Sequence, residues 1–291
     1  MKKRIMGLFL AVLLGLSAFV PSALAIDAGQ SRVTIGANLD ETQRAQIYKD
    51  FGIEEGDVTE LKVTNAEERA YLEGLVSENK IGSVALSCVY IKTLDEGEGL
   101  HITTNNINWC SKEMYINALT TAGITDAEVK ISAPFGVSGT AALTGLYKAY
   151  EDITGEQLDM TAKSVAAEEI VITGNLAEML GDVDATELVN QLKLILEQTK
   201  GMSDDEVRSE IKNVAANINV QVTDAQIEQL LKLCRSLEKL DASELAEKVN
   251  SITKTIENAN KVEKTVSKVV EDVKTFFASV GTFFSKLFTK K

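Results

Sequence analysis

The sequence predicts an α+β protein in which a ferredoxin-like N-terminal domain is followed by an all-helical region. Between Val58 and Ala133, the apolar pattern gives the order strand, helix, strand, strand, helix, strand, which is typical of the split βαβ arrangement. Strand signals end near Gly155, and amphipathic helical patterns follow. A heptad pattern of apolar residues then occupies the C-terminus.

The first 25 residues have the features of a secretory signal peptide. A basic start is followed by an apolar run from Ile5 to Val20, and the small residues Ala23 and Ala25 suit a cleavage site. The run is short for a membrane span, and an uncleaved anchor helix is the alternative. We therefore expect a secreted or cell-envelope protein that begins at Ile26.

The remaining chain is long enough for two domains, and its charge limits the partners. We expect an α/β domain at 26–157, a helical domain at 158–240 and a long amphipathic or coiled-coil helix at 241–291. The formal net charge of −13 disfavours nucleic acid, because phosphate binding requires basic patches. A single histidine excludes metal sites built on histidine pairs, and no cofactor motif is present.

The first elements have clear boundary signals. Val33 and Ile35 alternate with polar residues, as in a short strand. Asp40 with Gln43 has the spacing of a capping box, which predicts a helix that ends at Gly52.

The predicted ferredoxin-like unit follows. A strand near Val58 precedes a helix opened by Asn65 and Glu68. Two strands, at 81–94 and 100–104, are expected to form a hairpin; a helix from Ser111 to Gly123 and a strand ended by Pro134 complete the unit. The alternative is a larger mixed sheet that also includes Val33–Ile35.

Five further helices are expected, and two of them have capping residues, Ser203 and Thr223. The five predicted helices are Thr140–Ile153, Ala162–Thr173, Thr186–Lys200, Asp204–Asn219 and Asp224–Lys239, of which the last two are the capped ones.

The C-terminal helix is the strongest functional signal. From Leu245 to Leu287 apolar residues step alternately by four and three, with one stammer at Ala259. Its end combines an aromatic face with flanking lysines, which suits an anionic membrane surface or the cell wall. Packing against preceding helices, or a homo-oligomeric coiled coil, is the alternative. The candidate contact residues are Phe276, Phe277, Phe283, Phe284, Phe288, Lys286, Lys290 and Lys291.

Two loops contain candidate ligand-binding residues. Asn106, Asn108 and Trp109 would suit a sugar or peptide, although asparagine also favours loops and tryptophan favours cores. The loop at 136–140 joins a strand to a helix N-terminus, which favours anions. Its residues Ser138, Gly139 and Thr140 could equally serve as helix caps, and the loop lacks the lysine of a P-loop.

The cysteines and the histidine leave several alternatives open. His101 could act as a base for a nucleophilic Cys88 or Cys110, or it could be an ordinary strand residue. Cys88 and Cys110 could instead form a disulfide, which requires a close approach of their Cα atoms. Cys234 lies on an apolar helix face and is expected to be buried.

Several long motifs resemble a known family. They are Asn106–Trp109, Glu113–Leu119, Thr121–Gly123, Ala133–Phe135 and Val137–Gly145. Together they resemble the YpuA-like family (domain of unknown function 1002), which consists of exported proteins of Gram-positive bacteria. The resemblance implies a location outside the cytoplasmic membrane; it supplies no activity and no catalytic residues.

These observations favour a non-catalytic binding or scaffolding protein of the cell envelope, with a C-terminal helix for membrane or wall contact or for self-association. No spacing identifies a catalytic pair. The alternatives are a cell-wall hydrolase that uses carboxylates, and an extracellular chaperone or regulator that binds peptides at a sheet edge.

Overall fold

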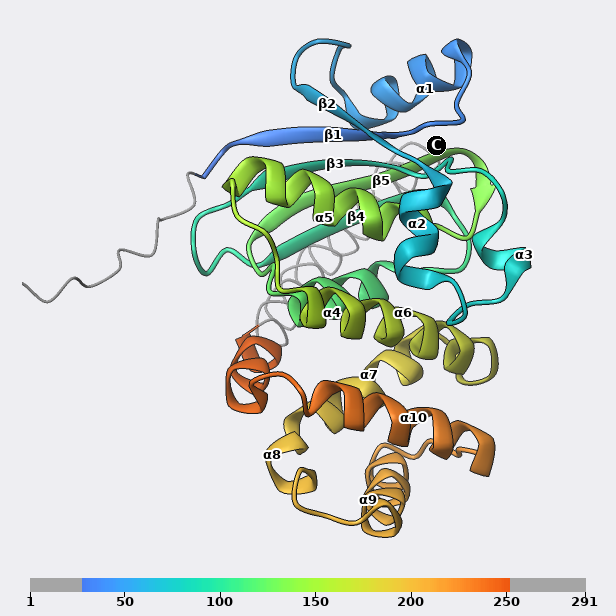
Figure 1. Ribbon diagram of the computed structural model, residues 1–291, viewed down its shortest axis with the longest axis vertical. Coiled ribbons are helices and arrows are strands. Elements are labelled where there is room, and N and C mark those ends of the chain that lie inside the picture. The colour runs from blue at the N-terminus through green and yellow to red at the C-terminus, as the bar shows by residue number, and fades with distance from the viewer. Residues whose placement is uncertain (1–27, 252–291) are drawn as a thin grey trace, which may run out of the picture.

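The computed structural model describes residues 28–251, which form a mixed five-stranded sheet, the ten helices α1 to α10 and a helical segment at 242–251 (Figure 1). The rest of the predicted heptad helix at 241–291 lies outside the described residues, so that helix stays a prediction. The expected signal peptide with its cleavage near Ala25, and the candidate contact residues between Phe276 and Lys291, lie outside the described residues. The strands are β1 (Ser31–Gly36), β2 (Thr59–Val63), β3 (Cys88–Thr93), β4 (Leu100–Ile107) and β5 (Ala127–Val137).

The strand order is β2-β1-β3-β5-β4, so the predicted ferredoxin-like order is wrong. The alternative, a larger mixed sheet that includes Val33–Ile35, is confirmed, since β1 pairs with β2 in parallel and with β3 in antiparallel orientation. The expected hairpin does not form, because β5 lies between β3 and β4. The carboxylate of Asp126, just before β5, accepts hydrogen bonds from the backbone N–H groups of Gly97 and Gly99, which ties the β3–β4 loop to the intervening strand.

The helices mostly follow their sequence signals. They are α1 (Glu41–Phe51), α2 (Asn65–Leu72), α3 (Glu78–Ile81), α4 (Lys112–Ala122), α5 (Thr140–Thr154), α6 (Met160–Leu180), α7 (Asp182–Leu194), α8 (Leu196–Thr199), α9 (Asp204–Asn217) and α10 (Asp224–Leu237). Capping boxes at Asp40, Ser203 and Thr223 start α1, α9 and α10 as expected. The predicted strand 81–94 is shorter than expected, because α3 and a loop occupy its first half.

Two apolar layers cover the sheet unequally. On one face, α1 lies against β5, and its residues Ile47 and Phe51 form a small apolar cluster with Val33 and Ile35 of β1. The opposite face carries the larger core, to which α4, α5 and α6 contribute.

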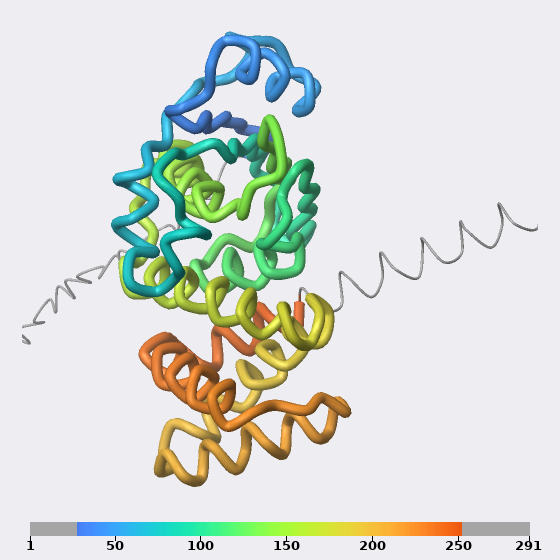
Figure 2. Tube along the Cα trace, turned by 90° about the vertical axis from the view of Figure 1, so that its right-hand side faces the viewer, coloured from blue at the N-terminus to red at the C-terminus, as the bar shows by residue number. Residues whose placement is uncertain are grey.

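Helix α6 belongs to two cores. Its residues Ala166 and Ile170 pack in the core of the sheet, and Val165 and Ile172 pack in a second core with α7, α9 and α10. Those helices lie at one end of the molecule, and α1 lies at the other (Figures 1 and 2). The predicted boundary at 157/158 thus precedes a helix that serves both cores, and independent folding of the two parts stays a prediction.

A buried ion pair joins the sheet-bearing part to the helical part. The ammonium of Lys193 on α7 lies 2.5 Å from the carboxylate of Glu169 on α6, and both side chains are almost inaccessible. Thr121 on α4 donates its hydroxyl to the same carboxylate at 2.5 Å. Three helices therefore meet at one buried ion pair. Of these, α4 belongs to the sheet-bearing part of the molecule.

No helix within residues 28–251 has the length and hydropathy that crossing a membrane requires.

Candidate functional site

A cleft of about 310 Å³ lies where β5 turns into α5. One wall is the loop that runs from Gly136 to Ala141, and the other is α3 with the segment that follows it. Asn108, at the end of β4, and Glu68 on α2 complete the lining.

The loop between β5 and α5 has a fixed shape. Gly139 adopts a φ of 95°, and a Cβ atom there would lie 2.5 Å from the hydroxyl of Tyr115 and 2.6 Å from a methyl group of Ile107. Only glycine fits both the backbone and the space. The Tyr115 hydroxyl donates to the Gly139 carbonyl at 2.6 Å, which anchors the loop to α4.

Hydroxyl and carboxyl groups converge beneath this loop. The Thr140 hydroxyl and one oxygen of the Glu68 carboxyl lie at a hydrogen-bond distance of 2.5 Å, and Asn65 donates its amide to the other oxygen at 3.1 Å. The hydroxyl of Ser138 donates to the carbonyl of Lys80 at 2.7 Å and lies 3.1 Å from the Thr140 hydroxyl.

Glu68 is the unusual group of the cleft. Its side chain is 1% exposed, and burial raises its pKa above the ordinary glutamate value, although the hydrogen bonds from Thr140 and Asn65 oppose the shift. The neutral form is therefore favoured more than in an exposed glutamate, and the carboxyl group can serve as a hydrogen-bonding group in the cleft.

The cleft also has an apolar rim. Among the lining residues, Val84 is 44% exposed, and Leu86 and Val137 are half-buried. A cleft that combines polar groups with accessible apolar side chains can hold a small molecule.

The structure brings together four of the six predicted ligand-binding residues. Asn108, Ser138, Gly139 and Thr140 line the cleft. Asn106 instead forms a bulge in β4 with a φ of 57°, and its amide donates to the carbonyl of Ala133.

Trp109 does not line the cleft and holds α6 against the sheet-bearing part. It is 8% exposed, and its ring lies directly on Gly174, where a Cβ atom would come within 2.5 Å. Its indole N–H donates to Glu178 at 3.1 Å, and the ammonium of Lys80 lies 4.9 Å from its ring centroid.

Sequence reasoning missed Glu68 and the segment around α3. Glu68 was expected at the helix start, whereas Thr64 and Glu67 form the capping box of α2. One signal could have found it: Glu68 precedes Leu72 by four residues and thus shares the buried face of the helix.

The structure contradicts the cysteine pairings. All three cysteines are free and buried, so the disulfide between Cys88 and Cys110 is absent. The sulfur of Cys88 instead accepts the N–H of Gly36 at 3.3 Å. His101 is exposed on β4, separated from Cys88 on β3 by β5, and burial raises the pKa of the Cys88 and Cys110 thiols to about 12, which disfavours a nucleophilic thiolate.

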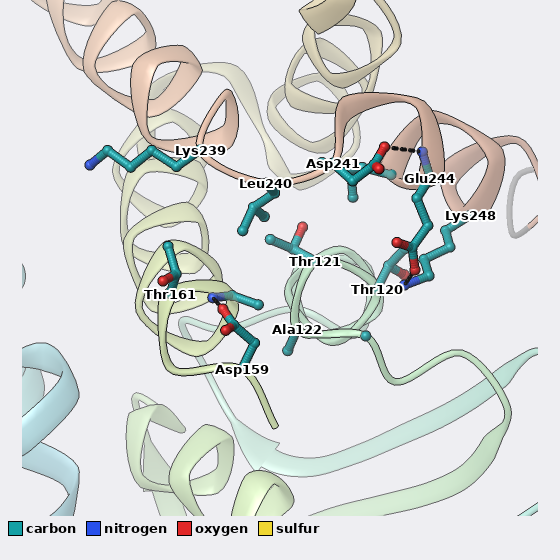
Figure 3. Close-up of a pocket in the computed structure, with 13 residues that line it drawn as sticks. Thr120, Thr121, Ala122, Asp159, Thr161, Lys239, Leu240, Asp241, Glu244 and Lys248 are labelled. Carbon is teal, nitrogen blue, oxygen red and sulfur yellow. Dashed lines mark hydrogen bonds and ion pairs between the residues drawn. The ribbon is translucent and has the colours of Figure 1, made fainter. Parts of the chain in front are cut away.

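A second cavity of about 420 Å³ lies between the end of α4, the start of α6 and the segment Lys239–Lys248 (Figure 3). Four of its five charged side chains, all except that of Lys239, have partners. Asp159 and Asp241 accept backbone N–H groups at helix starts, and Lys248 pairs with Glu244 at 2.6 Å. None of the predicted binding residues lies there. In residues 28–251, no three histidine, cysteine or acidic side chains are arranged to hold a metal ion.

Comparisons with known proteins place the chain in a family. The family model described as a protein of unknown function (DUF1002) matches residues 35–259. The uncharacterized protein YpuA of Bacillus subtilis (strain 168) is 37% identical over 268 residues, which cover 89% of this chain and 91% of that protein. No solved structure matches. The resemblance noted from the sequence motifs is therefore confirmed, and the chain belongs to the DUF1002 family of proteins of unknown function.

Proposed function

We propose that this protein is an exported, non-catalytic binding protein of the cell envelope, and that the cleft at the start of α5 takes an uncharged sugar bearing hydroxyl and N-acetyl groups. The observation that carries the proposal is the convergence of Asn108, Ser138 and Thr140 on one cleft.

The chemistry of the lining supports a neutral polar ligand. Amides and hydroxyls from Asn79, Asn108, Ser87, Ser138 and Thr140 supply both donors and acceptors. The apolar rim can pack against the carbon skeleton of a sugar ring. A site with placed polar groups and apolar walls gives orientation and affinity together.

A hydrolase is the less favoured alternative. Glu68 is the one carboxyl group among the residues that line the cleft. Glycoside hydrolysis by the usual route requires a pair of carboxylates across the scissile bond. The cleft therefore lacks the second acid.

Isothermal titration with N,N′-diacetylchitobiose tests the binding function. The variant Gly136→Ala adds a methyl group 3.2 Å from the Asn108 amide, inside the cleft, and it should weaken binding at least tenfold. Gly201→Ala is the matched control, because its added methyl group meets no atom within 4 Å. Equal affinity in both variants, or no binding by the wild type, would reject the proposed ligand site.

The proposed export rests on the N-terminal sequence. Cleavage near Ala25 would leave a chain that begins at Ile26. N-terminal sequencing of the protein recovered from the wall and culture fractions should therefore start at Ile26. A full-length chain confined to the cytoplasm would contradict the proposal.

The C-terminal helix is proposed as the contact with an anionic membrane surface or the wall. Its support is the sequence pattern of phenylalanines between Phe276 and Phe288 with lysines beside them. The full chain should sediment with phosphatidylglycerol vesicles, and a chain lacking 276–291 should not. If the shortened chain still sediments with the vesicles, membrane contact lies elsewhere in the protein. Self-association through this helix is tested separately, by sedimentation equilibrium of the same two chains without vesicles.

The edge of β4 gives limited support to the chaperone alternative. In the described sheet β4 pairs on one side only, with β5, and Thr103 to Asn106 are exposed in succession. The bulge at Asn106 interrupts this edge, and bulges of this kind protect edges from added strands. The cleft therefore remains the better-supported site.

A further inference from the structure

We propose that Glu68 carries a proton in the folded protein and thereby completes a directed chain of hydrogen bonds, from Glu68 to Thr140 to Ser138 to the carbonyl of Lys80, that fixes the hydroxyl groups of the cleft. The proposal deepens the proposed function, on whose sugar ligand its binding consequence rests.

The hydroxyl groups of Ser138 and Thr140 have too few hydrogens for all of their contacts if Glu68 is ionised. Each hydroxyl group has one hydrogen to donate. Ser138 uses its hydrogen on the carbonyl of Lys80 at 2.7 Å, because a carbonyl can only accept. If Glu68 is ionised, Thr140 must use its single hydrogen on the carboxylate at 2.5 Å.

In that ionised arrangement, the contact between the two hydroxyl oxygens has no hydrogen. The oxygens of Ser138 and Thr140 lie 3.1 Å apart, which is hydrogen-bond distance. Two oxygen lone pairs would then face each other in a partly buried site, which is unfavourable.

One proton on Glu68 removes this conflict. The carboxylic acid donates to Thr140, which releases the Thr140 hydrogen for Ser138, and Ser138 donates to the carbonyl of Lys80. The second carboxyl oxygen still accepts the amide of Asn65 at 3.1 Å. Every contact in the group is then a hydrogen bond with one donor and one acceptor.

The surroundings of Glu68 favour this neutral form. The carboxyl group is buried, and burial raises its pKa. Of the charged or titratable groups around it, Arg69 on the same helix favours the ionised form and is directed to Glu78. Cys110 and Tyr115 on the α4 side are buried, and their pKa values are raised.

Lys80 completes this set of neighbours. The backbone carbonyl of Lys80 accepts the last hydrogen bond of the series. Its ammonium instead binds Glu178 at 2.8 Å and lies over the ring of Trp109. It therefore provides no direct ion pair to Glu68.

The directed chain defines what the cleft offers to a ligand. The hydrogens of Thr140 and Ser138 are committed within the chain, so both hydroxyl oxygens present lone pairs to the cleft. A ligand must therefore approach them with O–H or N–H donors, which a sugar with hydroxyl and N-acetyl groups has. Ionisation of Glu68 would leave both hydrogens committed, to the carboxylate and to the carbonyl of Lys80, but it would remove the hydrogen bond between Ser138 and Thr140. The two hydroxyl groups would then lose their fixed spacing, which weakens binding.

The proton on Glu68 is tested in the full ligand-free protein by ¹³C NMR of glutamate carboxyl groups. The Glu68 resonance is identified by its loss in Glu68→Gln. We expect its titration midpoint above the ordinary glutamate pKa of about 4.3, with Glu68 still protonated at the pH at which binding is measured. A Glu68 resonance at the carboxylate shift at that pH would overturn the proposal. If Glu68→Gln does not fold, side-chain-to-backbone correlations in the wild type assign the resonance instead.

Stability gives an independent readout. Because the folded-state pKa is raised, the unfolded chain releases this proton first, and stability is lost as pH rises from the unfolded towards the folded pKa. The folding constant of the wild type should fall relative to that of Glu68→Gln by up to tenfold per pH unit in this window. The control Glu197→Gln, at an exposed position, should run parallel to the wild type. A constant ratio between wild type and Glu68→Gln would overturn the proposal.

Measuring sugar binding at several pH values distinguishes the proposed proton on Glu68 from the proposed sugar ligand. Affinity for diacetylchitobiose should fall at least tenfold across the Glu68 titration in the wild type and stay constant in Glu68→Gln, whose amide can donate to Thr140 at every pH. The same fall in both proteins would overturn the link between the proton and the ligand. Absence of chitobiose binding by the wild type would reject the proposed ligand, while the NMR titration still decides the proton.

Discussion

Replacing Lys193 by methionine should destabilise the protein strongly, because it leaves the carboxylate of Glu169 buried without its counter-charge. Both side chains are at most 1% exposed, and the ammonium and carboxylate groups are 2.5 Å apart. Lys193 also donates to the backbone carbonyl of Asn117 at 3.2 Å. Methionine is unbranched and only one heavy atom shorter than lysine, so the substitution creates little empty space.

The expected cost is about 3–5 kcal/mol, the range for removal of one partner from a buried ion pair. Because both side chains are almost inaccessible, solvent does not screen the attraction between the two charges. Burial lowers the pKa of Lys193, although the Glu169 carboxylate opposes this shift, as expected where a charge is costly to bury. Urea unfolding, followed by circular dichroism at pH 7, measures the change.

A double variant distinguishes charge from packing. Lys193→Met combined with Glu169→Gln removes both charges and keeps an acceptor for the Thr121 hydroxyl. It should be more stable than Lys193→Met alone by at least about 2 kcal/mol, a coupling expected of residues in direct contact. The control Lys212→Met, at an exposed pair with Asp224, should cause no measurable change. A loss below about 1 kcal/mol for Lys193→Met would refute the reasoning.

Three further predictions test the packing. Gly174→Ala should cost about 1–3 kcal/mol through overpacking against Trp109 and shift the fluorescence of this only tryptophan; unchanged emission would contradict the contact. A thiol reagent at pH 8 should label no cysteine in the native protein and all three after unfolding without reductant, whereas a single reactive thiol would indicate a disulfide. Asp40→Ala should cost about 1 kcal/mol by removing the α1 cap, and no change in the unfolding midpoint would show that the cap contributes nothing.

Local features of the fold could be predicted from the sequence, because they depend on residues that are close along the chain. The capping box of Asp40 and Gln43 and the stop at Gly52 involve contacts within one helix. Strand order depends on distant contacts. The insertion of β5 between β3 and β4 is tied to the contact of Asp126 with Gly97, which no local pattern indicates.

The candidate site was predictable only in part, for the same reason. Ser138 and Thr140 stand beside a strand-to-helix turn, which marks a binding loop in sequence. Glu68 reaches that turn from 72 residues away, and its role depends on burial by other elements. Trp109 shows the opposite case, since a residue suited to ligand contact is used to pack against α6.

The measurement that tests the central claim most directly is a backbone NMR titration of the full chain with diacetylchitobiose. We predict that the shifted amides cluster around the cleft, in the segments 82–87, 108–110 and 136–141. Shifts confined to 120–123 and 239–248 would move the site to the second cavity. The absence of any shift at millimolar sugar would contradict the proposed ligand.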